Sequence, residues 1–269
     1  MPERRRMRPL LGTFVELGAS GPDDAALDAA LAAGFAAIER AQALWSFQSP
    51  VSELSRLNQA GGEAVTQSRE TIRLLWLARA LTRLSDGLFN CTVGGALVAQ
   101  GVLPDHGGPP SLPMGVAGDI ELNGMQARLR RPVRLTLDGI AKGFAIDLAV
   151  SAMRRCVRAG WVNAGGDLRV FGEHALPVAR RELDGSHTEL GSLRQAALAS
   201  SAVGHGDAQR FPGCIVGAQP PAIGVWSVVA RQAWRADALT KVAALAPTAE
   251  RSAWVQRLGG ALLAPALPG

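Results

Sequence analysis

Lysine, tyrosine and cysteine are scarce in this chain, and each scarcity narrows the range of possible functions. Only two of the 28 basic residues, Lys142 and Lys241, are lysine rather than arginine. Lysine carries a compact ammonium on a flexible stem, whereas guanidinium is a planar fork, so a crowded site that accepts one need not accept the other. The two lysines are therefore candidates for a specific role. Tyrosine is absent and aromatic residues make up 5% of the chain, which leaves little surface on which single-stranded nucleic acid could stack.

Cysteine pairs and long apolar runs are lacking as well. The three cysteines, Cys91, Cys156 and Cys214, are widely spaced and form no CxxC pair. This pattern argues against both a disulfide framework and a zinc site. Near the N-terminus the segment PLLGTFVELGAS alternates and breaks instead of running apolar. We therefore expect no signal peptide, no lipid-attachment cysteine, no integral membrane segment and a cytoplasmic location.

Positive charge is in excess, with a formal net charge of +5 and a pI near 10.0. Arginines gather at 4–8 and 128–134. The first cluster favours a basic N-terminal tail over residues 1–8, and the second a solvated strand or turn. The hypothesis that the protein binds nucleic acid rests on the pI alone, and it predicts steeply salt-dependent DNA binding. We expect no nucleic-acid partner.

The apolar content is ample for a core, because 48% of the 269 residues are hydrophobic and 19% are charged. Hydrophobic periodicity predicts helices and strands that mix without a strict βαβ rhythm. The expected fold is α+β, a single domain over 1–269 with a mixed or antiparallel sheet and flanking helices. The main expected elements are helices over 23–45, 68–85, 140–158 and 236–246, a loop over 101–118, strands IELNG and ARLRRPVRLTL, and a hairpin over 161–172.

The segment LTLDGIAKGFAID contains the first lysine and looks like a strand that turns into a helix N-terminus. Such a turn directs backbone N–H groups at an anion, and Gly139 allows close approach, so a phosphate could bind with Lys142 as its counter-charge. The alternative is structural. Asp138 would cap the helix and pair with Lys142 four residues later.

Three further segments each have a structural and a functional interpretation. NAGGDLRVFG is a hairpin turn, or its glycines leave room for a flat ligand. In SDGLFNCTVGG, Phe89 is a core residue, while Asn90 has the donors and acceptors that recognise a base or flavin edge. ADALTK opens a helix in which Asp237 is either a first-turn carboxylate paired with Lys241 or a metal ligand beside a polyphosphate.

Six segments in this order resemble the successive signature blocks of the ApbE family, the FAD-dependent protein FMN transferases. The blocks are RPLLGTFVEL, WSFQSPVSELSRLN, SDGLFNCTVGG, LDGIAKGFAID, NAGGDLRVFG and ADALTK, and they span roughly residues 8 to 246. Each block alone is weak, but their order makes coincidence a poor explanation. The resemblance implies binding of FAD and Mg²⁺. It also implies transfer of FMN to a Ser or Thr hydroxyl of a target protein, with release of AMP.

The resemblance also implies a set of site residues. Asp237 and Lys142 would be catalytic, and Gly139, Asp237 and Thr240 would hold the metal. The residues implied for cofactor binding are Leu11, Phe47, Leu88, Phe89, Asn90, Thr136, Asp138 and Lys142.

Several positions depart from the family pattern. Asn90 stands where the family has a carboxylate, Thr136 where it has its first acid, and Lys241 where it has a metal-ligating Thr. Cys214 and Gly217 replace a histidine and an aspartate. These changes support an alternative, an FAD-binding carrier or sensor that has lost transferase activity. The sequence leaves the role of Lys241 open.

Overall fold

The computed structural model describes residues 2–108, 110–204 and 214–263, which form two compact units. The larger unit comprises the described residues of Met1–Gln42, Lys142–Gly213 and Ala222–Gly269. The smaller unit comprises those of Ala43–Ala141 and Cys214–Pro221. Each unit is compact by itself, and a single domain over 1–269 stays a prediction.

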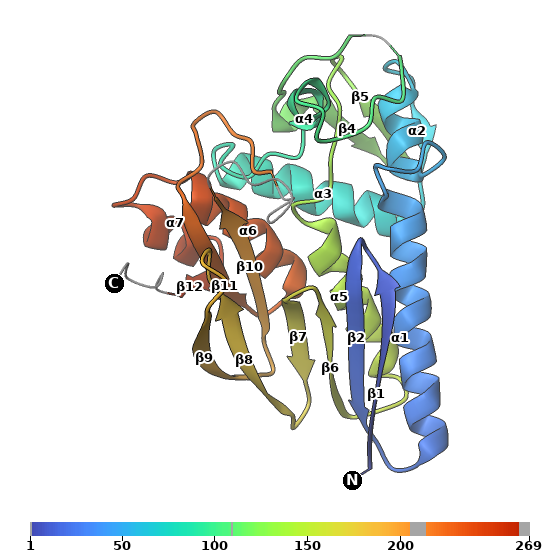
Figure 1. The fold of residues 1–269 in the computed structure, drawn as a ribbon. Coiled ribbons are helices and arrows are strands. Elements are labelled where there is room, and N and C mark those ends of the chain that lie inside the picture. The colour runs from blue at the N-terminus through green and yellow to red at the C-terminus, as the bar shows by residue number, and fades with distance from the viewer. Residues whose placement is uncertain (1, 109, 205–213, 264–269) are drawn as a thin grey trace. The chain divides into compact units, whose positions relative to one another are not determined.

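The larger unit is built on an antiparallel sheet, for which its described residues provide seven strands in the order β1-β2-β6-β7-β10-β11-β12. These strands are β1 Glu3–Leu10, β2 Thr13–Ser20, β6 Ala159–Ala164, β7 Asp167–Phe171, β10 Ala197–Val203, β11 Gly224–Ala230 and β12 Gly260–Leu262. A separate hairpin joins β8 (Ala175–Arg181) to β9 (His187–Arg194). The flanking helices are α1 Asp24–Trp45, α5 Ala141–Met153, α6 Ala233–Leu245 and α7 Arg251–Arg257. This arrangement, shown in Figure 1, confirms the predicted α+β class.

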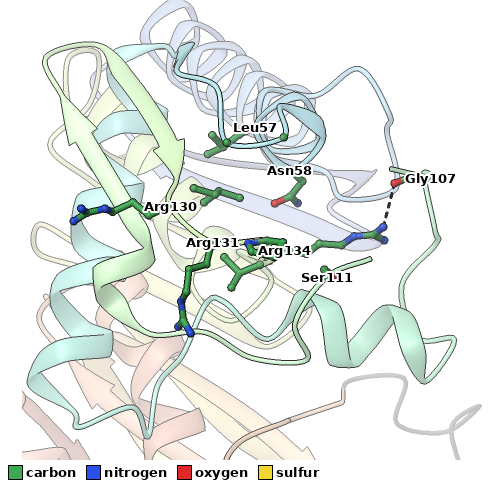
Figure 2. A pocket seen from close by; sticks show the side chains of 12 residues that line it. Leu57, Asn58, Gly107, Ser111, Arg130, Arg131 and Arg134 are labelled. Carbon is green, nitrogen blue, oxygen red and sulfur yellow. Dashed lines mark hydrogen bonds between the residues drawn. The ribbon is translucent and has the colours of Figure 1, made fainter. Parts of the chain in front are cut away.

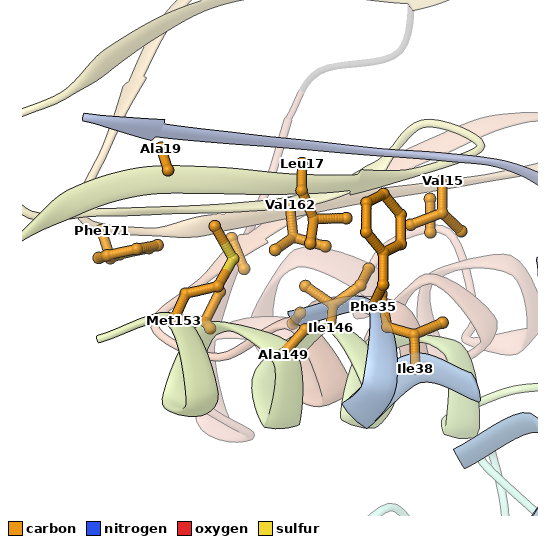
Figure 3. Close-up of a cluster of buried hydrophobic side chains, with 14 of the residues drawn as sticks. Val15, Leu17, Ala19, Phe35, Ile38, Ile146, Ala149, Met153, Val162 and Phe171 are labelled. Carbon is orange, nitrogen blue, oxygen red and sulfur yellow. The ribbon is translucent and has the colours of Figure 1, made fainter. Parts of the chain in front are cut away.

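The main core lies between one face of this sheet and the helices α1 and α5 (Figure 3). Alternate residues of a strand point to opposite faces. Val162 of β6 accordingly joins Phe35 of α1 and Ile146 of α5 in the core, whereas its neighbour Trp161 packs on the other face with Leu168 of β7. Helix α6 packs against β10 and β11 (Figure 1). The same alternation decides which polar residues of β7 face the helices.

The expected basic tail over residues 1–8 is wrong, because Glu3–Leu10 form strand β1, paired with β2 from Glu3↔Ser20 to Leu10↔Thr13. Its alternate arginines lie on one side of the strand and meet acidic residues of α1. The ion pairs join Arg4 to Asp24 and Asp28, Arg6 to Asp28, and Arg8 to Glu39. Every second side chain of a strand points to the same side, so Arg4, Arg6 and Arg8 can all face α1.

The smaller unit contains short helices and a small sheet of order β3-β5-β4. Its elements are α2 Glu53–Gln59, β3 Val65–Thr66, α3 Arg69–Leu84, α4 Gly94–Ala99, the 3₁₀ turn η1 Ala117–Asp119, β4 Ile120–Asn123 and β5 Gln126–Leu129. The predicted helix over 68–85 is confirmed as α3, and the Ser68 side chain caps it by accepting from the Thr71 N–H. Strand β5 ends earlier than predicted, before Pro132, which has no N–H to donate to a ladder. Among the helices of the described ranges, none is long and apolar enough to cross a membrane.

Candidate functional site

Lys142 is the second residue of α5 in the larger unit, and it pairs with an aspartate that the sequence motifs did not single out. Its Nζ lies 3.0 Å from Oδ2 of Asp167, the first residue of β7. The other carboxylate oxygen of Asp167 accepts from the Ser200 N–H at 3.2 Å. Asp167 follows the Gly165–Gly166 turn, whose positive φ angles confirm the predicted hairpin. The sequence signal that could have identified Asp167 is its position directly after the two glycines of the turn.

Asp237 lies in the body of α6 and is fully buried. The prediction that it falls in the first turn is wrong, because α6 begins at Ala233. Its Oδ2 accepts from the Gly143 N–H of α5 at 3.0 Å, and its Oδ1 lies 2.5 Å from Nζ of Lys241. The same ammonium also donates to the Asp237 carbonyl oxygen at 3.1 Å. Both carboxylate oxygens are therefore engaged within the larger unit.

The two ion pairs form one electrostatic cluster, which we call the lysine–aspartate quartet: Lys142, Asp167, Asp237 and Lys241. Burial raises the pKa of Asp167, Lys142 opposes this rise, the Asp237 charge adds to it, and Lys241 opposes it. Two carboxylates are balanced by two ammonium groups, as buried charge requires. The only lysines of the chain therefore lie in the same cluster.

The quartet has an inner and an outer side. The carboxylate side chains are buried, with 4% of Asp167 and 1% of Asp237 exposed, whereas 32% of Lys142 and 19% of Lys241 are exposed. Long lysine side chains can bury their stems while their ammonium groups reach water. The exposed members of the quartet are therefore its two ammonium groups, with the carboxylates behind them.

Helix α5 holds the quartet in place through two further residues, Asp147 and Gly143. Asp147 accepts from the Ala233 and Trp234 N–H groups at 3.0 Å each, so it caps the start of α6, and it pairs with Arg169 of β7. Burial raises the pKa of Asp147, while Arg169 and the two N–H groups oppose the rise. At Gly143 an added Cβ would lie 2.3 Å from the Ala233 carbonyl oxygen. Glycine at this position lets α5 and α6 approach backbone to backbone.

Thr240, predicted as a metal ligand, is buried next to the quartet. Its hydroxyl donates to the Asp237 carbonyl oxygen at 2.7 Å and lies 2.7 Å from the Ser201 hydroxyl. Mg²⁺ prefers octahedral oxygen ligands, usually with one or two carboxylates. Here the Asp237 oxygens already accept from an ammonium and an N–H, and the described residues contain no group of three or more His, Cys, Asp or Glu side chains suited to a metal. As arranged, these described residues around Asp237 do not fit Mg²⁺.

Most of the other predicted cofactor residues belong to the smaller unit. Asn90 holds a loop: its Oδ1 accepts from the Thr92 N–H and hydroxyl, and its Nδ2 donates to the Gly115 carbonyl. Phe89 is buried nearby, as its structural interpretation predicts, and Leu88 is half-buried. These contacts use much of the hydrogen-bonding capacity of Asn90, and recognition of a flavin by it stays a prediction.

The remaining predicted residues lie in three places. Phe47 is buried and stacks on His106, with ring centroids 5.9 Å apart. The Thr136 hydroxyl donates to Asp138 at 3.1 Å, and Gly139 follows in the same unit. Leu11 belongs to the larger unit, in the β1–β2 turn with a φ of 55°, where its N–H donates to Gln42. Their roles toward a cofactor stay predictions.

A pocket of about 170 Å³ lies within the smaller unit, along the arginine-rich segment 130–134 (Figure 2). Arg134 donates to the Gly107 carbonyl oxygen at 3.1 Å and pairs with Asp105 at 2.7 Å. Arg131 makes two contacts of 2.6 Å with Asp119. Carboxylates thus offset these arginines, which supports the interpretation of this cluster as a solvated strand or turn.

The larger unit thus combines an antiparallel sheet and flanking helices with a cluster in which two partly exposed lysines pair with two buried aspartates. Comparison with known sequences gives the family: the profile of the ApbE family matches residues 11–264. The chain therefore belongs to the ApbE family.

Individual relatives agree with this assignment. The FAD:protein FMN transferase of Rhodobacter capsulatus is 31% identical over 181 residues, which cover 61% of this chain and 34% of that protein. The matched part thus spans about a third of that curated relative. The Thermotoga maritima ApbE protein has the same fold, with a TM-score of 0.80, 22% identity and coverage of 97% of this chain and 94% of the other. The apo flavinyl transferase ApbE of Pseudomonas stutzeri gives a TM-score of 0.79, 18% identity, and coverage of 97% and 94%.

Proposed function

We propose that this protein binds FAD and transfers its FMN half to a Ser or Thr hydroxyl of a target protein, with release of AMP. Membership of the ApbE family supports the proposal, as does the name of the Rhodobacter capsulatus relative. The observation that carries it is the outward exposure of Lys142 and Lys241 above two buried carboxylates. A diphosphate is the part of FAD that such a surface would bind.

The reaction is a displacement at phosphorus. The acceptor hydroxyl oxygen forms a bond to the FMN phosphorus, the bond from that phosphorus to the bridging oxygen breaks, and AMP leaves with that oxygen. The hydroxyl proton passes to solvent or to a base. Reactions of this type need mainly positioning and positive charge on the phosphate oxygens. Lys142 and Lys241 would provide that charge, and Asp167 and Asp237 would hold the two ammonium groups in position.

Magnesium is implied by the resemblance to the family, with Gly139, Asp237 and Thr240 as its predicted ligands. The contacts of Asp237 with Lys241 and with the Gly143 N–H do not favour this assignment. We therefore assign no step of the reaction to a metal ion.

A second candidate function is an FAD carrier or sensor without transferase activity. One observation favours it: Lys241 stands where the family pattern has a ligating Thr, and its ammonium lies against Asp237. An ammonium that holds the diphosphate could bind FAD firmly without promoting transfer.

One experiment separates the two candidates. The purified protein is incubated with FAD and a substrate protein that carries a flavinylation sequence, with Mg²⁺ or with EDTA. Covalent flavin on the substrate is measured by mass spectrometry, and AMP release by chromatography. Modified substrate together with AMP supports transfer, whereas quenched flavin fluorescence without either product supports the carrier. Absence of both FAD binding and transfer would exclude both functions.

A further inference from the structure

The ammonium of Lys241 lies against Asp237, the residue that the family resemblance implies as a metal ligand. Its Nζ contacts both Oδ1 and the main-chain carbonyl oxygen of the same aspartate, at 2.5 Å and 3.1 Å. Two oxygens of one residue thus converge on a single ammonium group. Lysine suits this position because its ammonium is compact, whereas a planar guanidinium would not match the two oxygens in the same way.

We propose that the ammonium of Lys241 is the resident cation of this site. It takes the place of a divalent metal at Asp237 and leaves the quartet able to bind a phosphate or diphosphate without any metal ion. An ammonium has three N–H donors. Among the described residues, the contacts with Asp237 account for two of them, so the third can donate to a ligand oxygen.

The electrostatics of the quartet support this proposal. A divalent cation that entered between the quartet and solvent would first meet the ammonium groups of Lys241 and Lys142, because these are the exposed members. The carboxylates behind them already have partners: Asp167 has Lys142 and the Ser200 N–H, and Asp237 has Lys241 and the Gly143 N–H. Like charges repel, and buried pairs are little screened by salt. An anion experiences the opposite force.

The proposal predicts how wild type and a Lys241→Thr variant respond to Mn²⁺, followed by electron paramagnetic resonance. Wild type is expected to bind Mn²⁺ weakly. Lys241→Thr removes the ammonium, frees Oδ1 of Asp237 and adds a hydroxyl, so its affinity for Mn²⁺ is expected to rise by about tenfold or more. Adding Asp237→Asn to that variant is expected to abolish the gain. Arg257→Thr is the control for net charge, because Arg257 lies over the Trp254 ring instead of in the quartet.

The anion is tested with inorganic pyrophosphate by titration calorimetry in EDTA. Wild type is expected to bind pyrophosphate, and Lys241→Thr to bind it at least about tenfold more weakly, with part of the loss restored by Mg²⁺. Lys241→Met, which has a side chain of similar length, serves if the Thr variant does not fold. The metal-free binding of a diphosphate rests on the function proposed above, whereas the exclusion of a divalent ion from Asp237 does not.

Two results would overturn the proposal. One is Mn²⁺ binding by wild type that is as tight as that of Lys241→Thr. The other is failure of wild type to bind pyrophosphate in EDTA. A lack of FMN transfer alongside the expected Mn²⁺ and pyrophosphate results would overturn only the proposed transferase function.

Discussion

Lys142 and Asp167 form an ion pair, 3.0 Å between Nζ and Oδ2, that joins the start of α5 to the start of β7. The aspartate is almost fully buried and the lysine is partly exposed. This relationship gives Lys142 a partner inside the larger unit and a side that faces solvent. The same arrangement recurs at Lys241 and Asp237, and it has consequences for stability and for ligand binding.

Asp167→Asn should lower the free energy of unfolding by about 1–3 kcal/mol, because it removes a buried carboxylate that pairs with the Lys142 ammonium and accepts from the Ser200 N–H. Urea denaturation followed by circular dichroism measures the loss. Glu189→Gln is the matched control: Glu189 is exposed on β9, and its change should stay within about 0.5 kcal/mol. Equal effects of the two substitutions would show that the Lys142–Asp167 pair contributes nothing to stability.

Gly143→Ala should destabilise the protein by about 1–3 kcal/mol or more, because the new methyl group would meet the main chain of Ala233 instead of a flexible side chain. It should also weaken FAD binding, since the Gly143 N–H holds Asp237. Thermal unfolding and flavin fluorescence measure these effects. Gly118→Ala is the control, because an added Cβ there would have no neighbour closer than 4.0 Å. A Gly143→Ala variant as stable as Gly118→Ala would contradict the close approach of α5 and α6.

FAD should bind more tightly than FMN or riboflavin, because the lysines of the quartet face the phosphate groups of the ligand in the proposed complex. Lys142→Gln should weaken FAD binding by about tenfold or more, the loss of one charge-assisted contact. Its affinity for riboflavin, which has no phosphate, should change little. Flavin fluorescence titration of the three ligands against both proteins provides the measurement. Equal affinities of wild type for the three would show that the diphosphate contributes nothing to recognition.

Acid should destabilise the protein partly through Asp119 of the smaller unit. The Arg131 guanidinium holds the pKa of Asp119 below its ordinary value, although burial acts in the opposite direction. A carboxyl with a lowered pKa in the folded state adds stability above its ordinary pKa, and this stability is lost as the pH falls through the folded value.

The melting temperature of wild type should therefore fall more steeply than that of Asp119→Asn between about pH 5 and pH 3. Differential scanning calorimetry at several pH values makes the comparison. Asp147 and Asp167, whose pKa values are raised by burial, are present in both proteins, so their contributions cancel. Parallel curves for the two proteins would refute the role of Asp119.

The order of the local sequence motifs along the chain was enough to predict the fold class and the family. Helix α3 with its Ser68 cap and the hairpin at Gly165–Gly166 were predicted correctly, because caps, turns and periodicity act between residues close in sequence. The scarcity of lysine, a property of composition alone, also pointed to Lys142 and Lys241.

Only the tertiary structure decided what these residues do. The contact of the Gly143 N–H with Asp237 joins residues 94 positions apart. The pairing of Lys142 with Asp167 depends on which face of β7 the carboxylate takes and on α5 covering that face. The arginines before residue 9 look like a tail in the sequence, but their main chain pairs with β2 as a strand, and acidic residues of α1 lie opposite their side chains. Such partners come from separate elements, and the sheet order and helix packing that bring them together leave no signal within a local stretch of sequence.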